Sequence, residues 1–346
     1  MPVARSRRRT AAAITLAASL TAGATLLLSA CGPDSRPDYG KATHTPPAPG
    51  GSTPPPTTAG ADPAASKAPL LNGTAHNGLT ISDGTRYVVM NGTRVDFGTA
   101  VRDLAWSPDG KKAAFVDGDG DLAVAAADGS GRRVVAKNPG SQNWSHPTWQ
   151  VRTYDPSYGV PAADNLQFAV RTAAGVSRLY TVPATGENAT PKVLGLNGEP
   201  GGDEKPLPQT GNLWPNGGGT QGGSVYANSA DGHVYVRDDN LRQQGYQVAP
   251  GSEPAFDPSG DEGVVFVRSV AGHDHLFLDR SDGNGHLVEK DLTPGATTDY
   301  TEPAFSPGGT VIAARTPDGI VTLPADGSHA PVVVSDYRGL PAFRAS

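Results

Sequence analysis

The chain has 346 residues, of which 44 are Gly and 32 are Pro, and only 18% are charged. This composition excludes a helical bundle or a coiled coil, because Gly and Pro destabilise helix interiors. A hydrophobic content of 37% is nevertheless enough for a sizeable core. The sequence therefore favours a strand-rich and turn-rich fold, built as one large domain or two ordinary ones.

The first 30 residues have the features of an export signal. Four arginines between residues 5 and 9 precede an uncharged, largely apolar run over residues 11–28. Residues 28–31 read Leu-Ser-Ala-Cys, which resembles the lipobox of bacterial lipoproteins, whose cysteine is lipidated and begins the mature chain. Cys31 is the sole cysteine, so no disulfide can form within the chain. We expect residues 1–30 to be a lipoprotein signal peptide. The lipid on Cys31 would then hold the protein at the outer face of the cytoplasmic membrane.

Two alternatives stay open for this segment. An apolar run of 18 residues is just long enough to span a membrane. However, Gly32 and Pro33 do not supply the positive flank of a stop-transfer sequence. Residues 6–9 are also similar to a twin-arginine export signal, although Thr10 replaces the usual large apolar residue. The sequence does not decide between the general and the twin-arginine export routes.

The chain after the signal begins with a predicted tether. Ten of the residues from 32 to 69 are proline, and the segment shows no apolar periodicity. We therefore predict that residues 31–76 form a disordered Pro/Thr/Gly-rich tether that starts at the lipidated Cys31. The mature chain carries 24 basic and 34 acidic side chains. This negative charge argues against nucleic acid as a partner, and it leaves the lipid as the only membrane attachment.

Beyond residue 77 the sequence repeats a unit of four short predicted strands. The three clearest copies open with an aromatic anchor and continue into a Ser-Pro-Asp-Gly-like turn and a hairpin with an Asp-Gly turn. Their anchors are Trp106, Phe256 and Phe305. In these copies we predict strands at residues 112–116, 122–126, 134–135, 263–268, 275–278, 287–288, 311–315, 319–323 and 332–334. Most anchors recur every 40–50 residues, which is typical of propeller blades.

Two weaker copies lack the Ser-Pro-Asp-Gly turn, which leaves their boundaries undetermined. One is anchored at Trp149 and the other at Trp214. Their predicted strands cover residues 166–170, 178–182, 192–194, 224–227, 233–236 and 246–248.

The two ends of the repeat region predict how the fold closes. Residues 341–343 open a further unit just before the chain stops, whereas predicted strands at 79–81, 87–90 and 94–97 have no opening anchor. Together they make one complete blade, and this closure would hide the exposed sheet edges of an open array. We predict an all-β fold over residues 77–346. It is a six-bladed β-propeller of four-stranded blades, closed by N- and C-terminal strands that share one blade.

The repeat resembles that of TolB-like propellers, in which an apolar-aromatic pair precedes Ser-Pro-Asp-Gly and a short strand. The likeness is strongest at residues 105–116, 255–267 and 304–314. This resemblance implies a six-bladed propeller that works outside the cytoplasmic membrane by binding other proteins. It identifies no particular partner.

We place a candidate binding face at one mouth of the propeller channel. Trp144, Tyr300 and Tyr337 each precede a blade anchor by five or six residues, where connectors between blades gather at one mouth. Exposed aromatics beside acids suit protein recognition. The candidate partner-binding residues are Trp144, Trp214, Asp299, Tyr300, Asp336 and Tyr337. The alternative is that these aromatics hold adjacent blades together.

Two insertions belong to opposite faces in this arrangement. The Gly-rich insertion at about residues 196–224, which contains Trp214, lies on the mouth side as a lid or a loose loop. Residues 150–165, with Tyr154 and Tyr158, lie on the opposite face.

Metal binding has two weak candidates. Asp117, Asp119 and Asp121 alternate as in a calcium loop, but Leu122 stands where such a loop needs Gly. The position favours a hairpin turn. His273 and His275 flank an aspartate, and we expect them in an exposed loop. We therefore predict no metal and no cofactor.

The sequence contains no Gly-x-Ser-x-Gly motif and no sialidase Asp box, so we predict that the protein is not an enzyme. The predicted function is protein–protein interaction in the cell envelope, with an envelope or secreted protein as the partner. The alternatives are a propeller that binds a small ligand or carbohydrate, and a propeller enzyme.

Overall fold

The computed structural model describes residues 70–196, 206–218, 222–239, 245–260, 263–282, 284 and 286–346. The predicted signal peptide, Cys31 and the tether up to residue 69 lie outside these residues. The chain divides into residues 1–65 and residues 66–346, and the description below concerns the second unit. Among the residues described, no helix is long and apolar enough to cross a membrane.

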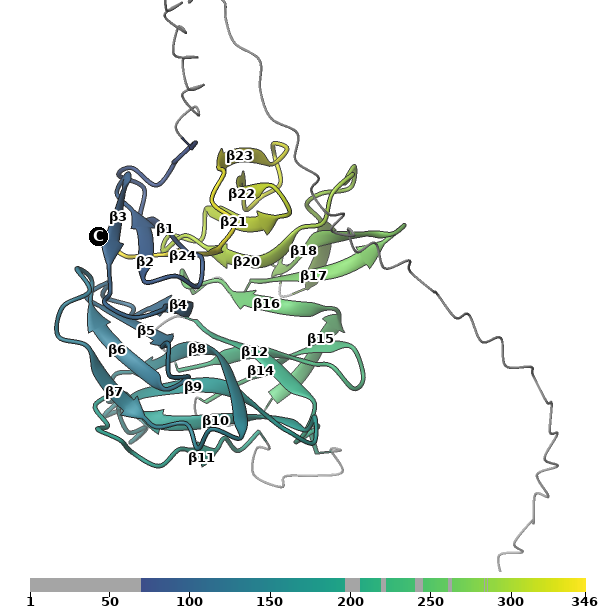
Figure 1. Cartoon of the computed structure of the whole chain (residues 1–346). Coiled ribbons are helices and arrows are strands. Elements are labelled where there is room, and N and C mark those ends of the chain that lie inside the picture. Colours follow the sequence, from purple (N-terminus) through teal and green to yellow (C-terminus); the bar gives the residue numbers. More distant parts are fainter. Residues whose placement is uncertain are drawn as a thin grey trace, which may run out of the picture. The chain divides into compact units, whose positions relative to one another are not determined.

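Over the described part of the chain, 24 strands form six antiparallel sheets of four strands each, arranged as blades in a ring (Figure 1). From its inner to its outer strand, blade 1 contains β24 (Leu340–Phe343), β1 (Leu79–Ser82), β2 (Tyr87–Met90) and β3 (Thr93–Asp96). Blade 2 contains β4 (Arg102–Trp106), β5 (Lys112–Val116), β6 (Leu122–Ala126) and β7 (Arg133–Ala136). Blade 3 contains β8 (Gln142–Arg152), β9 (Ala163–Thr172), β10 (Ser177–Pro183) and β11 (Lys192–Val193).

The second half of the ring repeats this order. Blade 4 contains β12 (Asn212–Gly217), β13 (Ser224–Asn228), β14 (His233–Arg237) and β15 (Gly245–Pro250). Blade 5 contains β16 (Ser252–Phe256), β17 (Val264–Val270), β18 (His273–Ser281) and β19 (Leu287–Asp291). Blade 6 contains β20 (Thr301–Phe305), β21 (Val311–Thr316), β22 (Gly319–Pro324) and β23 (Val332–Ser335). The all-β, six-bladed fold predicted from the sequence is therefore confirmed.

The ring closes through blade 1, as the two ends of the repeat region predict. The C-terminal β24 pairs antiparallel with β1, with Pro341 opposite Ile81 and Phe343 opposite Leu79. The inner strands contact one another in ring order, and β24 also contacts both β20 and β4. Blades 3 and 6 therefore lie opposite each other across the channel.

Ser-Pro-Asp-Gly turns shape the inner hairpins. In blade 2, the Gly110 amide donates to the Ser107 carbonyl oxygen at 2.8 Å, which closes the turn. The Ser107 hydroxyl bonds Asp109 and also accepts from the Lys112 amide at 3.0 Å. Gly110 has a φ of +66°, and a Cβ there would overlap the Ala345 carbonyl oxygen. The motif thus specifies both the turn and the close approach of the C-terminal segment.

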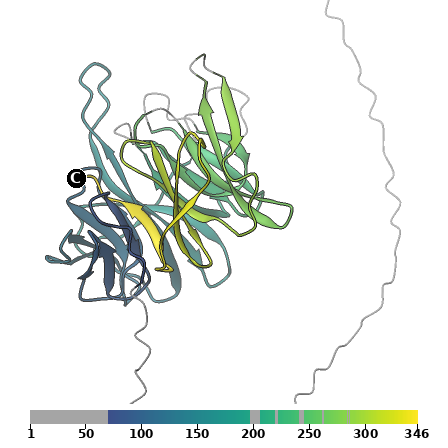
Figure 2. The same ribbon diagram turned by 90° about the horizontal axis from the view of Figure 1, so that it is seen from above.

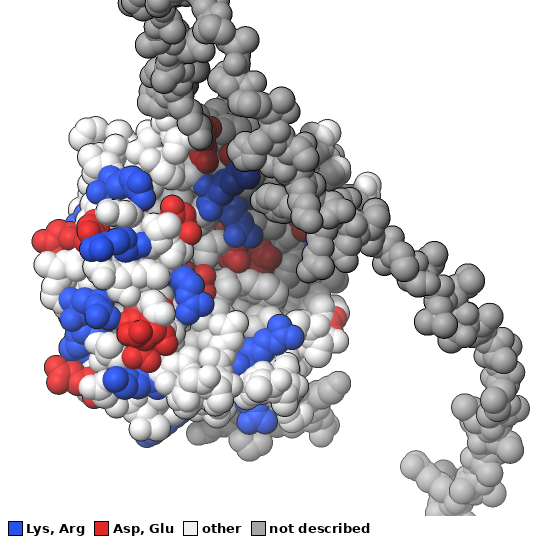
Figure 3. Space-filling model, viewed as in Figure 1, with Lys and Arg blue, Asp and Glu red and all other residues white. Residues whose placement is uncertain are grey.

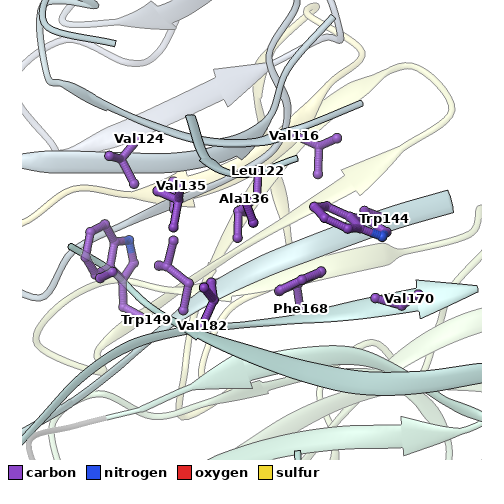
Figure 4. Close-up of a cluster of buried hydrophobic side chains, with 13 residues drawn as sticks. Val116, Leu122, Val124, Val135, Ala136, Trp144, Trp149, Phe168, Val170 and Val182 are labelled. Carbon is purple, nitrogen blue, oxygen red and sulfur yellow. The ribbon is translucent and has the colours of Figure 1, made fainter. Parts of the chain in front are cut away.

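The hydrophobic core lies between successive blades. Figure 4 shows one such cluster, in which Trp144 packs against Phe168 with ring centroids 4.9 Å apart. Alternating side chains on the strands nearer the channel face the two neighbouring blades, so these parts of the sheets are buried on both faces, whereas outer strands such as β3 and β19 are largely exposed. This burial explains the continuous apolar runs of strands such as β5 and β6.

Hydrogen bonds between neighbouring blades also hold the ring together. From β8, Gln150 and Arg152 donate forward to Gly222 and Asp239 of blade 4. Five other bonds run from an inner strand to the preceding blade, from blade 2 to blade 1, from 3 to 2, from 4 to 3, from 5 to 4 and from 6 to 5. In that order they are Trp106 Nε1 to Thr80 Oγ1 at 2.9 Å, Trp149 Nε1 to the Ala105 oxygen at 3.1 Å, the Gly217 amide to Thr148 Oγ1 at 2.8 Å, the Phe256 amide to Asn216 Oδ1 at 2.9 Å and the Glu302 amide to Glu253 Oε2 at 2.7 Å.

Candidate functional site at the channel mouth

Five inner strands share one backbone irregularity at the same end of the channel. In each strand the pairing register shifts and leaves two residues unpaired, as in β4 between Arg102 and Ala105. The first unpaired residue has a left-handed φ of about +50° in every case. These five residues are Asp103 (φ 55°), His146 (51°), Trp214 (50°), Glu253 (49°) and Glu302 (50°), which we call the mouth ring.

The mouth ring lines a cavity of about 340 Å³ in the centre of the propeller. A left-handed φ is unfavourable for residues other than Gly, and bulges that carry such strain concentrate at functional sites. In four of the five strands the second unpaired residue is a proline. In blade 1 the position of the first unpaired residue is taken by Leu340, which pairs regularly with Ser82, so this strand has no bulge there. The shared bulge therefore presents three carboxyl groups, an imidazole and an indole to one cavity.

His146 and Glu302 meet across the channel. Nε2 of His146 lies 3.2 Å from Oε1 of Glu302, although the residues belong to blades 3 and 6. A second contact links His146 to blade 2, because its backbone amide donates to Asp103 Oδ2 at 3.1 Å. The His146 ring also lies edge-on to the Trp214 ring, with centroids 6.2 Å apart. The cluster thus joins residues from four blades.

Charges in the mouth ring set the protonation of its members. Burial opposes the charge of Glu302, but the hydrogen bond and charge of His146, with Arg315 and Trp214, lower its pKa overall. Burial, together with the charge of Glu302, raises the pKa of Glu253 to about 7. Burial also disfavours imidazolium at His146, yet the nearby carboxylates, Glu302 foremost, raise its pKa to about 8. At neutral pH the ring therefore holds a His146–Glu302 ion pair.

Nδ1 of His146 is the unsatisfied atom of the cluster. It is buried and has no hydrogen-bond partner, although Asp103 Oδ2 lies 4.0 Å away. The two lining residues with hydroxyl groups, Ser107 and Thr148, are already hydrogen-bonded to neighbouring turns or strands. The arrangement therefore offers charged and aromatic binding groups, without an activated nucleophile among these residues.

A shallower cavity of about 350 Å³ lies between blades 5 and 6 on the same side of the ring. Asp274, Asp299, Arg315 and Arg338 contribute its charged groups. Arg315 links the two cavities, because its charge also acts on Glu253 and Glu302.

The structure removes Trp144 from the predicted binding face. Its side chain is only 2% exposed and packs in the core between blades 2 and 3 (Figure 4). Trp144 lies within β8 and not in an exposed connector. It therefore fits the alternative, in which these aromatics hold adjacent blades together.

Each of the two Asp-Tyr pairs makes contacts within the fold. Asp299 accepts from the Asp274 amide at 3.1 Å, and Asp336 accepts from the Leu71 amide at 2.8 Å. Tyr300 and Tyr337 are partly buried and pack against clusters on neighbouring sheets. Their remaining exposed surface leaves partner binding at these four residues a prediction.

The prediction that Trp214 is a blade anchor was wrong. The bulge pairs Asn216 with Val225, which makes Gly217 the residue equivalent to Trp149 and Phe256. A Cβ at Gly217 would overlap the Trp149 carbonyl oxygen, so blade 4 has no aromatic at this position. Trp214 stands three residues earlier, in the mouth ring. Part of the Gly-rich insertion that contains it lies outside the described residues.

The residues of both weak metal candidates make contacts within the fold. Asp117 Oδ1 accepts from the Asp119 and Asp121 amides, and Oδ2 pairs with Arg132 at 2.7 Å, so its carboxylate builds the hairpin turn. No group of three or more potential metal-binding side chains occurs in the described part of the chain. The expectation of an exposed loop at the histidine pair was wrong for His275. That residue lies within β18, is 4% exposed and bonds Asp291 at 2.9 Å.

Comparisons with known proteins show no family for this chain. No protein-family model matches the chain, and no curated protein matches it. Among solved structures it is similar to the tricorn protease, with 14% identity and a TM-score of 0.47, over 77% of this chain and 26% of that one. It is also similar to regucalcin, a calcium-binding protein from Agrobacterium tumefaciens, with 14% identity and a TM-score of 0.43, over 80% and 94% of the two chains.

A chain of a nidogen–laminin complex is a third example, with 10% identity and a TM-score of 0.45, over 77% of this chain and 98% of that one. The protein spans about a quarter of the tricorn protease chain that it matches. All these similarities are distant. The class of the protein rests on its own six sheets, which define a six-bladed β-propeller.

Proposed function

We propose that this protein is a TolB-like envelope lipoprotein that binds another protein at the mouth ring of its propeller. The observation that carries the proposal is the repeated bulge, which directs the first unpaired residue of five inner strands into one cavity. Inner strands are the most constrained part of the ring, because each lies between two neighbouring inner strands. Binding groups held on such strands need little ordering when a ligand arrives.

The composition of the mouth ring suits recognition of a polypeptide. Trp214 supplies an aromatic surface, and the surrounding carboxylates and imidazole supply directional polar contacts. On the face drawn in Figure 3, basic and acidic side chains are interspersed. A segment of a partner protein that enters the channel would contact several blades at once.

Anchoring by Cys31 belongs to the same proposal. The lipobox-like sequence and the Pro-rich segment after it support an export signal, a lipid on Cys31 and a tether that carries the propeller away from the membrane. The net negative charge of the mature chain supports attachment by the lipid and not by a basic patch.

A second candidate function is binding of a small ligand. The cavity of about 340 Å³ falls in the size range of ligand pockets and is lined by converging polar groups. A small ligand would occupy the same residues, so both candidates predict that the mouth ring is the site.

The test is a cross-linking pull-down from intact cells. Wild type is compared with Trp214→Asn and Glu253→Gln, since Asn tolerates the left-handed φ and Gln keeps the shape of Glu. Tyr158→Asn is the matched control, because Tyr158 is 67% exposed in the β8–β9 hairpin at the opposite end of the inner strand. Thermal unfolding first verifies that each variant is folded.

The proposal expects one envelope protein to be captured by wild type and by the Tyr158 variant, and to be lost from the two mouth-ring variants. Loss only in the Tyr158 variant would place the interface on the other face. If no protein is captured by any variant, the small-ligand candidate replaces the proposal.

A further inference from the structure

We infer that the mouth ring binds a cationic side chain of the partner, a lysine ammonium or an arginine guanidinium, and that it does so when His146 is neutral. This inference rests on the proposed function, because it takes the mouth ring as the binding site. It adds the chemical class of the group that enters and the condition under which it enters.

The carboxyl groups of the mouth ring surround a positive charge, that of protonated His146. Asp103, Glu253 and Glu302 come from blades 2, 5 and 6 and converge on one cavity. The imidazole of His146 lies between two of them, with Nε2 at 3.2 Å from Glu302 and Nδ1 at 4.0 Å from Asp103. Within the ring itself, three carboxyl groups are therefore near one cation that can lose its charge, while Arg315 acts on Glu253 and Glu302 from the neighbouring cavity.

Loss of one proton turns Nδ1 of His146 from a hydrogen-bond donor into an acceptor. If His146 keeps its proton on Nε2, the hydrogen bond to Glu302 persists and Nδ1 becomes an acceptor. Nδ1 is buried and has no other partner, and it lies beside the Asp103 carboxylate. An N–H group of a ligand could then donate to both atoms. When His146 is protonated, the same position presents an N–H and repels a cation.

Trp214 adds an aromatic surface to this position. Its indole helps to lower the pKa of Glu302, and its ring centroid lies 6.2 Å from that of His146. A cation near the face of an indole ring is stabilised by the charge distribution of the ring, most strongly where water is excluded. The combination of carboxylates, a free imidazole nitrogen and an indole is suited to an ammonium or guanidinium group.

The remaining charged groups around His146 reinforce the same pH dependence. Glu302 is ionised throughout the neutral range because its pKa is lowered, whereas Glu253 gains its charge near pH 7. Arg315 donates through Nε to Thr301 Oγ1 at 3.2 Å, at the neighbouring cavity. As the pH rises, the ring gains the charge of Glu253 and loses that of His146, so both changes favour an external cation.

The neutral fraction of His146 sets the expected size of the effect. With a pKa of about 8, this fraction increases about 30-fold between pH 6.5 and pH 9, and the apparent affinity for a cation increases by about the same factor. Lysine and arginine side chains keep their charge over this range. An uncharged side chain of the same length has no reason to follow the titration of His146.

The experiment uses two blocked tripeptides, acetyl-Gly-Lys-Gly-amide and its norleucine counterpart, which lacks only the ammonium group. Each is titrated into the purified full-length protein at pH 6.5, 7.5 and 9, and binding is followed by the His146 ring resonances in NMR spectra. His146→Asn and Glu302→Gln are the variants, and Tyr158→Asn is the control. Calcium chloride is titrated separately to test for a divalent cation.

The inference expects the lysine peptide alone to bind, about 30-fold more tightly at pH 9 than at pH 6.5. It expects His146→Asn, followed by its amide resonances, to lose most of this pH dependence and Glu302→Gln to weaken binding at every pH. Equal binding of the two peptides, or tighter binding at pH 6.5, would overturn it, as would a response to calcium alone. If the partner is still captured by Glu302→Gln but not by Trp214→Asn, the proposed function stands and this inference fails.

Discussion

His146 and Glu302 are 156 residues apart, yet their side chains meet at 3.2 Å across the centre of the propeller. Because they belong to opposite blades, this contact forms only when the whole ring has closed. The protonation state of His146 is therefore coupled both to the folded state and to what occupies the channel mouth.

This coupling predicts a pH dependence of stability. The pKa of His146 is raised from 6.5 to about 8, so the stability that its charge contributes is full below pH 6.5 and lost as the pH rises through 8. Its size is about 2 kcal/mol, since one pKa unit corresponds to about 1.4 kcal/mol. Denaturant unfolding at pH 6.5 and pH 9 should show this loss in wild type.

His146→Asn should lack that part of the loss. The raised pKa of Glu253 acts in the same direction at lower pH, because ionisation of this buried carboxyl opposes folding as the pH rises through about 7. A wild-type protein that becomes more stable than His146→Asn as the pH rises would contradict this account of the mouth ring.

Trp144 provides a test of core against surface. Its side chain is buried beside Phe168, so Trp144→Ala should lower the free energy of unfolding by about 3–5 kcal/mol. Tyr154→Ala is the control, because Tyr154 is 60% exposed in the hairpin that projects from the ring (Figure 2), and the change should stay within about 0.5 kcal/mol. A small effect at Trp144 would contradict its assignment to the core between blades 2 and 3.

The segment that leads into the propeller is attached to blade 6. Asn72 bridges to Ser335, the Gly73 amide donates to the Val334 oxygen at 2.8 Å, and the Leu71 amide donates to Asp336 at 2.8 Å. Asp336→Ala should release this segment while the blades stay folded. We expect faster amide exchange at residues 71–74 and an unchanged exchange rate in β21. Slower or unchanged exchange at residues 71–74 would show that Asp336 does not hold the segment.

Lipidation has a direct genetic test. Cys31→Ser removes the only thiol that could carry the lipid, so the protein should leave the membrane fraction or accumulate as an uncleaved precursor. Fractionation and immunoblotting of cells that express wild type or Cys31→Ser would show this. Normal processing and membrane retention of the variant would disprove lipid anchoring at Cys31.

Most of the fold was predictable because its turns are encoded locally. Ser-Pro-Asp-Gly turns and Asp-Gly hairpins fix the strand boundaries, and the predicted limits of β2, β5 and β6 match the structure. Blade 4 was misaligned because Gly217 replaces the aromatic anchor and Trp214 stands three residues earlier. The presence of an aromatic residue in the sequence does not by itself indicate which position of the strand it occupies.

Of the mouth ring, the sequence indicated Trp214 as a candidate binding residue, whereas the other four members were missed because they are polar and far apart in the sequence. Long-range convergence such as that of Asp103 with His146, or His146 with Glu302, follows from ring closure and not from local pattern. A signal was nevertheless present. Aligning the repeats places His146, Trp214, Glu253 and Glu302 in one column, each directly before a proline. The left-handed backbone that turns them inward is visible only in the structure.

The central claim is that a protein partner binds at the channel mouth. The most direct measurement places a photo-cross-linking amino acid at Arg338, whose side chain is 71% exposed beside the mouth, or at Tyr158 on the opposite face, and irradiates intact cells. We predict a cross-linked envelope protein from position 338 and none from position 158. An adduct from position 158 alone, or the same adduct from both positions, would contradict the claim.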